Sequence, residues 1–311
     1  MLNEIKDCRY ISSIGMMLSL DDNKMITYDA NGARYDFSKA LNGKDGSCIY
    51  VKFQYIPEFL NNVFPHIKYR FILVTGDGDE TLPNDLCDIH TFISILNNDK
   101  IIHWYAANSI ECLHPKLTLI PIGVNFHSLT YRTFNKHWGE LAQTPLQQEA
   151  EIIEIRDSAR PFYEREIKCY SNFHFAKYKE FGNPRQSAID KIDKEIAYYE
   201  PETINRRQTW INQSKYAFVL SPIGHGLDCH RTWEALILGC IAVVLSSPLD
   251  SLYKGLPVLI LNDWSDLNDE LLKNTVEKFK EINFDYERIT TKYWIDKIKG
   301  RTIERNNKIE N

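Results

Sequence analysis

The sequence lacks the features that mark repeat proteins, disulfide scaffolds and zinc proteins. It has no internal repeat and no low-complexity tract, and none of its seven cysteines forms a Cys-x-x-Cys pair. This spacing fits neither a disulfide framework nor a zinc site and favours reduced thiols. Cys229 and His230 are neighbours, but no second pair of ligands accompanies them at zinc-site spacing. We therefore expect a cytoplasmic protein, in the cytoplasm of a host if the source is a virus.

The sequence also lacks a basic surplus and a long apolar run. Its formal net charge of -5 argues against nucleic acid as a partner, because neutralising phosphates requires a basic surface. The longest apolar stretch, 235–245, is shorter than the roughly 20 residues that cross a bilayer. The opening residues, MLNEIKDCRY, include acidic side chains and no long apolar core. We expect neither a secretory signal nor a membrane anchor.

What the sequence does have is an ordinary globular composition and the length of two domains. Hydrophobic residues make up 43% and charged residues 25% of its 311 positions. From Tyr69 onward, apolar runs bounded by Gly and Pro alternate with helical spacing, which predicts α/β units. The strands predicted in this way are 71–75, 100–108, 115–126, 166–175, 215–221 and 256–263. The predicted helices are 89–99, 186–199 and much of 266–299.

A polar segment, 133–165, separates the two sets of elements and suggests a domain boundary at its end. The sequence then predicts an N-terminal domain over 1–165 and a C-terminal domain over 166–311 with a helical tail. The residues before Tyr69 give no clear prediction.

The most informative stretch is VLSPIGHGLDCHRTWEALILGCIAVVLSS, residues 219–247. A glycine-containing turn follows one apolar run and leads into a predicted helix. In parallel sheets, ligands bind at the carboxyl ends of strands, and helix N-termini attract anions. Arg231 could add a charge-assisted hydrogen bond to a phosphate, and Glu234 suits paired hydroxyls such as those of a ribose. An alternative is an ion pair between Arg231 and Glu234, which lie three residues apart.

The pattern S-P-x-G-x-G-L-D-C-H-R-T-W-E-A-L-x-x-G-C-I, followed by S-S-P-L-D-x-L-Y and L-P-V-x-I-x-x-D-W, resembles the exostosin-like glycosyltransferases, including their viral and bacterial branch. The resemblance is strong over 215–264 and looser over 71–83 and 101–126. It implies a GT-B fold, in which two Rossmann-like domains face each other across a cleft, here with a C-terminal helix closing back. It also implies inverting transfer from a nucleotide sugar, usually linked to UDP, without a bound metal.

The resemblance also implies which residues contact the nucleotide. Arg231 would hold a phosphate and Glu234 the ribose, while for His225 a hydrogen bond within the loop is an equal alternative. Ile223 departs from the family pattern, because relatives often carry a basic residue there. The residues assigned to the nucleotide are Ser221, Gly224, His225, Gly226, Arg231, Glu234, Ser246 and Ser247.

Inverting transfer needs a base that removes the proton of the acceptor hydroxyl. Asp77 and Asp79 follow the predicted strand 71–75 in TGDGDET, and the glycines allow a sharp turn. We favour Asp79, with Asp77 second; an Asx-type turn is the structural alternative for each. The D-x-D spacing of these residues would also suit a divalent cation. Trp104 and Tyr105, in the next predicted strand, could stack on a sugar ring; for Trp104 we favour the alternative, a place in the core.

Together these observations predict an inverting, metal-independent glycosyltransferase. Its substrates would be a UDP-sugar, with UDP-xylose as the first choice, and a hydroxyl of a glycan acceptor. The alternatives are a metal-dependent enzyme that uses Asp77 and Asp79, and a non-catalytic glycan-binding protein of the same fold.

Overall fold

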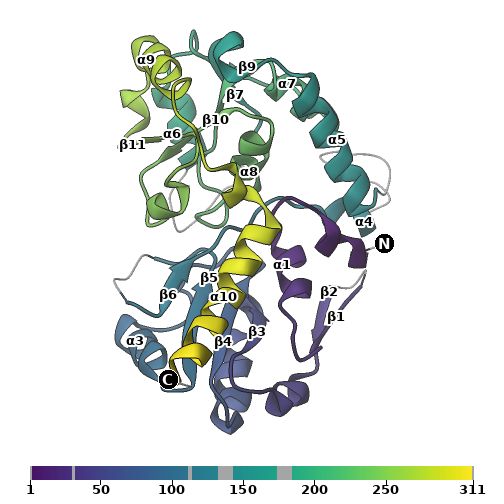
Figure 1. The fold of residues 1–311 in the computed structure, drawn as a ribbon. Coiled ribbons are helices and arrows are strands. Elements are labelled where there is room, and N and C mark those ends of the chain that lie inside the picture. Colours follow the sequence, from purple (N-terminus) through teal and green to yellow (C-terminus); the bar gives the residue numbers. More distant parts are fainter. Residues whose placement is uncertain (1, 30–31, 111–113, 132–142, 174–183, 310–311) are drawn as a thin grey trace. The chain divides into compact units, whose positions relative to one another are not determined.

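The computed structural model divides the chain into two compact units (Figure 1). Unit 1 contains Met1–Ile122 and Thr290–Asn311, and unit 2 contains Gly123–Ile289. Both are mixed α/β structures, each with a parallel sheet. The residues that the structure describes are 2–29, 32–110, 114–131, 143–173 and 184–309.

This division differs from the predicted boundary after residue 165. The helix α5 (Pro145–Ser158) packs on α7 (Arg206–Gln213) and α8 (His230–Ile237), so the polar segment belongs to unit 2. The C-terminal helix α10 (Thr291–Ile309) packs on α1 (Ser13–Ser19) and belongs to unit 1. The last helix of the predicted C-terminal domain therefore completes the N-terminal unit instead.

Unit 1 is built on a four-stranded parallel sheet of order β3-β4-β5-β6, with a separate antiparallel hairpin, β1-β2. Its strands are β1 (Ile26–Asp29), β2 (Gly32–Tyr35), β3 (Ser47–Lys52), β4 (Phe71–Gly76), β5 (Ile101–Ala106) and β6 (Leu117–Leu119). Besides α1 and α10, its α-helices are α2 (Ile56–Glu58) and α3 (Ile89–Asn97).

Both faces of the unit 1 sheet are covered, which explains why β4 and β5 are mostly apolar and buried along their whole length. On one face Trp104 packs on Phe92 of α3, with ring centroids 5.0 Å apart, and its indole N–H donates to Thr75 Oγ1 at 2.9 Å. This confirms the predicted core position of Trp104. On the other face the Tyr105 hydroxyl donates to the Lys297 carbonyl of α10 at 3.3 Å, and Figure 1 shows α10, in yellow, over this sheet.

Unit 2 is built on a five-stranded parallel sheet of order β11-β10-β9-β7-β8. Its strands are β7 (Glu166–Ser171), β8 (Ala197–Tyr199), β9 (Tyr216–Leu220), β10 (Ile241–Leu245) and β11 (Val258–Leu261). Its remaining α-helices are α4 (Ser128–Tyr131), α6 (Pro184–Lys191) and α9 (Asp269–Phe279).

The strand order of unit 2 reverses once. From β7 the chain moves outward to β8, then returns to the other side of β7 and continues through β9, β10 and β11. The carboxyl ends of β7 and β9 therefore flank a topological switch point, which is where open α/β sheets bind ligands. Right-handed crossovers in opposite directions place helices on both faces of such a sheet.

Most predicted elements after Tyr69 are present, but the helix predicted over 186–199 is wrong in its second half. Helix α6 ends at Lys191, and Ala197–Tyr199 forms the edge strand β8. Among the described residues, no helix combines the length and the apolar character that crossing a membrane requires.

Candidate functional site

The glycine-containing loop, 221–229, leaves the carboxyl end of β9 at the switch point of unit 2. Ser221, its first residue, is buried, and its hydroxyl lies 2.7 Å from Thr232 Oγ1 on α8. Its N–H donates to Val243 of β10 at 2.8 Å. The loop thus begins where the sequence predicts, but the Ser221 hydroxyl is engaged with α8.

Asp228 holds the start of α8 against the loop. Its buried carboxylate accepts the Cys229 N–H at 2.8 Å and the indole N–H of Trp233 at 2.9 Å. Trp233 is fully buried. The geometry of the turn is therefore fixed by side chains of the loop and helix themselves.

Gly224 lies where a side chain would have little room. A Cβ at this residue would lie 3.2 Å from Arg185 Nη2 and 3.2 Å from Cys229 Sγ. Its N–H donates to the Gly226 carbonyl at 3.1 Å, so the turn uses this amide internally. His225, between the two glycines, is exposed.

Arg231 lies in the first turn of α8 and faces the loop. Its guanidinium lies 5.5 Å from the ring centroid of Phe173, which follows β7, and its Nη1 donates to the Pro222 carbonyl at 3.5 Å. Burial lowers the pKa of Arg231, and the nearby charge of Arg185 lowers it further. Within the described parts of the chain, no carboxylate forms an ion pair with Arg231.

Glu234 does not pair with Arg231, the alternative raised by their spacing; it pairs with Arg206 of α7. Arg206 Nη2 lies 2.7 Å from Glu234 Oε1, and both side chains are nearly buried. Arg206 also donates to the Asn125 carbonyl at 2.6 Å and to Gln148 Oε1 at 2.9 Å. The predicted ribose ligand is therefore part of a buried network that joins α5, α7 and α8.

Ser246 and Ser247 follow β10, the neighbour of β9, at the same edge of the sheet. The Ser246 hydroxyl donates to Asp250 Oδ2 at 2.7 Å, and the Ser247 N–H donates to Asp250 Oδ1 at 2.9 Å. Both serines thus lie at the predicted edge, in a turn organised by Asp250.

In unit 1, Asp77 comes directly after β4 and is held in place. It has a left-handed backbone, with φ of 57°, which is uncommon for a residue other than glycine. Its carboxylate lies 3.0 Å from Nζ of Lys52, at the end of the adjacent strand β3, and accepts from Ser13 Oγ at 3.3 Å.

Asp79, by contrast, is exposed and forms no hydrogen bond or ion pair with the described residues. The loop that carries it is held at the preceding residue, because the Asn108 side chain donates to the Gly78 carbonyl at 3.0 Å. No group of three or more His, Cys, Asp or Glu side chains that could hold a metal ion is found in the described part of the chain.

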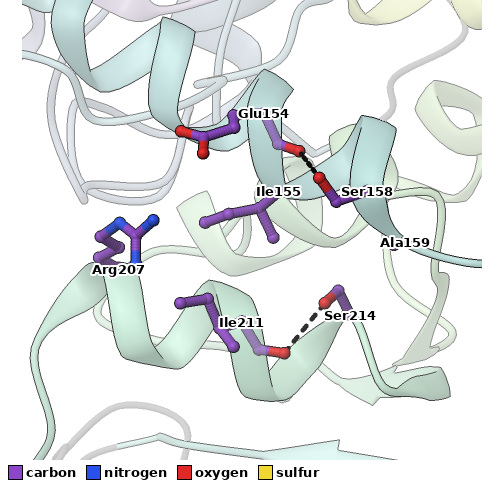
Figure 2. Close-up of a pocket in the computed structure, with 7 residues that line it drawn as sticks. All are labelled: Glu154, Ile155, Ser158, Ala159, Arg207, Ile211 and Ser214. Carbon is purple, nitrogen blue, oxygen red and sulfur yellow. Dashed lines mark hydrogen bonds between the residues drawn. The ribbon is translucent and has the colours of Figure 1, made fainter.

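A pocket lies elsewhere in unit 2, between α5 and α7 (Figure 2). Ile155 and Ile211 point toward one another across it, and Ser214 lies at one end. Ser214 precedes β9, whereas the glycine loop follows it, so the pocket and the loop are at opposite ends of that strand. The residues that line the pocket are Glu154, Ile155, Ser158, Ala159, Arg207, Ile211 and Ser214.

Sequence reasoning missed three basic residues at these sites: Lys52, Arg185 and Arg206. Lys52 and Arg206 meet their carboxylate partners, and Arg185 reaches the glycine loop, only in the folded chain. The sequence held a weak signal for Arg185, since it lies in the first turn of the next described helix after β7, at the edge where ligands are expected.

The fold and these loops define a mixed α/β protein with two parallel sheets and polar side chains at their carboxyl edges. The sequence matches no protein-family model and no curated protein.

Proposed function

We propose that this protein is an inverting, metal-independent glycosyltransferase of the GT-B class that uses a UDP-sugar. Unit 2 would bind the donor and unit 1 a glycan acceptor. UDP-xylose is the first donor to test, and the assignment to the GT-B class is part of the proposal.

The observation that carries the proposal is the place of Arg231. It lies beside a glycine-containing loop at a topological switch point, within a sheet whose strand order is that of nucleotide-binding doubly wound folds. Among the described residues, no carboxylate lies within ion-pair distance of this guanidinium, and the charge of Glu234 acts on it only from further away. The guanidinium can therefore form a direct contact with a phosphate.

In the proposed reaction, negative charge develops on the departing diphosphate as the bond to the sugar breaks. Arg231 and the amides at the start of α8 would stabilise that charge, and one well-placed donor contributes about 3–4 kcal/mol to such stabilisation. Asp79 would accept the proton of the attacking hydroxyl. Its exposed carboxylate is open to a substrate, whereas that of Asp77 is paired with Lys52.

Replacing Arg231 with glutamine should weaken UDP binding by about tenfold to a hundredfold, because a charge-assisted hydrogen bond to phosphate is lost. Isothermal titration calorimetry measures this directly. Arg207→Gln is the matched control, since Arg207 is half-exposed and lies at the pocket between α5 and α7. Equal UDP affinities for wild type and Arg231→Gln would remove Arg231 from the donor site.

Replacing Gly224 with alanine should also weaken UDP binding, by a smaller factor of about three to ten. The added methyl group would crowd Arg185 and Cys229, and close packing leaves little room to relax. Calorimetry against the wild type tests this, with circular dichroism to confirm that the fold is kept. Unchanged UDP affinity would show that this part of the loop is not at the diphosphate.

A further inference from the structure

Two arginines reach the glycine loop of unit 2 from different connections of the sheet. Arg185 lies in the first turn of α6, the next described helix after β7, and Arg231 lies in the first turn of α8, which follows β9. Because β7 and β9 are adjacent and flank the switch point, the two side chains come from its two sides. Of the two, only Arg231 belongs to the motif that points to a nucleotide.

Both guanidinium groups lie at the glycine loop. Nη2 of Arg185 is 3.2 Å from the place that a Cβ of Gly224 would occupy. Arg231 donates to the carbonyl of Pro222, two residues earlier in the same loop. Arg185 is only 9% exposed, so its guanidinium is held at the loop and not spread over the surface.

Bringing two positive charges together in a partly buried place is unfavourable. The charge of Arg185 acts on Arg231 strongly enough to contribute to its lowered pKa, after the larger effect of burial. An anion with two charged groups offsets this repulsion more effectively than one with a single group, since each guanidinium can then face one charged group. A diphosphate has this form.

Resting on the proposed function, we propose that Arg185 is a second diphosphate-binding residue and that the Arg185–Arg231 pair selects nucleoside diphosphates over monophosphates. Arg231 contacts one phosphate and Arg185 the other. Glycine at 224 lets the Arg185 side chain approach the loop backbone, which brings both phosphates within reach of the two arginines.

Calorimetry with UDP, UMP and inorganic pyrophosphate tests the pairing, using the whole chain in wild-type, Arg185→Gln, Arg185→Lys and Arg231→Gln forms. We expect Arg185→Gln to lower the affinity for UDP and for pyrophosphate at least tenfold and that for UMP less than threefold. Arg185→Lys keeps the charge but loses the planar fork, so its UDP affinity should lie between those of wild type and Arg185→Gln. Circular dichroism of each variant shows whether it is folded.

The outcomes separate this inference from the proposed function. Wild-type UDP affinity in Arg185→Gln, with a loss in Arg231→Gln, would overturn the role of Arg185 and leave the function standing. Equal losses for UDP and UMP would overturn the selection of diphosphates. The wild type could bind UDP no more tightly than pyrophosphate, while Arg185→Gln has a lower affinity for pyrophosphate. That result would support the arginine pair and refute the nucleotide-sugar function. A wild type that binds neither UDP nor pyrophosphate refutes both.

Discussion

Replacing Arg206 with methionine is expected to lower the free energy of unfolding of unit 2 by about 3–5 kcal/mol, because it leaves Glu234 as a buried carboxylate without its cation. Arg206 and Glu234 keep only 5% and 11% of their side chains exposed, so water can replace the lost partner only in part. The Asn125 carbonyl and Gln148 Oε1 also lose a donor. Methionine retains much of the contact with Trp210, whose ring centroid lies 4.5 Å from the guanidinium carbon.

The neighbouring residue gives a matched control. Arg207 forms an ion pair with Glu151 at 3.0 Å, but its own side chain is 49% exposed. Arg207→Met should therefore change the free energy of unfolding by less than about 1 kcal/mol. Urea unfolding followed by circular dichroism and tryptophan fluorescence compares the two variants. Similar small losses for both would show that the Arg206–Glu234 pair does not stabilise the fold.

A double variant separates the pairing from the other contacts of Arg206. Glu234→Gln removes the buried charge, so adding it to Arg206→Met should recover part of the lost stability. If Glu234 also binds a ribose, Glu234→Gln alone should weaken the binding of UDP more than the binding of pyrophosphate, because pyrophosphate has no ribose. Equal effects on UDP and pyrophosphate would make Glu234 a purely structural residue.

The strands of this fold could be predicted from the sequence where they are buried on both faces. The strands β4, β5, β9 and β10 are nearly continuous apolar runs, as expected of parallel strands between layers of helices. The edge strand β8 has only three residues and is separated from α6 by the short segment 192–196, so the sequence pattern predicts one continuous helix there. Short edge strands carry too few residues for a period of two to be recognised.

The domain boundary could not be predicted because local composition does not show which partner a helix packs against. The helix α5 has little amphipathic character, yet its Gln148 side chain donates to the Phe126 carbonyl and anchors it in unit 2. Likewise, α10 follows the last elements of unit 2 in sequence but donates and accepts hydrogen bonds within unit 1, where Thr291 contacts Tyr10. Both assignments depend on contacts between residues far apart in the chain.

The position of the glycine-containing loop could be predicted, but the partners of its side chains could not. Glycine residues after an apolar run indicate a turn at the carboxyl edge, and the loop lies there. The spacing of Arg231 and Glu234 suggested a local pair, but the partner of Glu234 is Arg206, 28 positions earlier. Lys52 and Asp77 are similarly distant and meet because β3 and β4 are neighbours in register. Only the folded sheet brings such partners together.

The second large effect is expected at the acceptor side, where Asp79→Asn should lower the rate of glycosyl transfer by about 10²–10⁴. An amide cannot accept the proton of the attacking hydroxyl, and the exposed carboxylate has no structural partner among the described residues whose loss would disturb the fold. UDP affinity and unfolding midpoint should therefore stay at wild-type values. The rate is measured as UDP release with whichever UDP-sugar stabilises the wild type against heat.

Variants of the neighbouring residues Asp77 and Glu80 test whether Asp79 is the base. Asp77→Asn keeps a residue that tolerates the left-handed backbone but loses the ion pair with Lys52, so we expect a smaller loss of rate, about tenfold, together with lower stability. Glu80→Gln is the control for a change of charge in the same loop and should leave the rate within about twofold. A full loss in Asp77→Asn with activity retained in Asp79→Asn would make Asp77 the base. Loss of wild-type activity in EDTA would instead indicate a cation held by both aspartates, because a proton acceptor alone requires no metal.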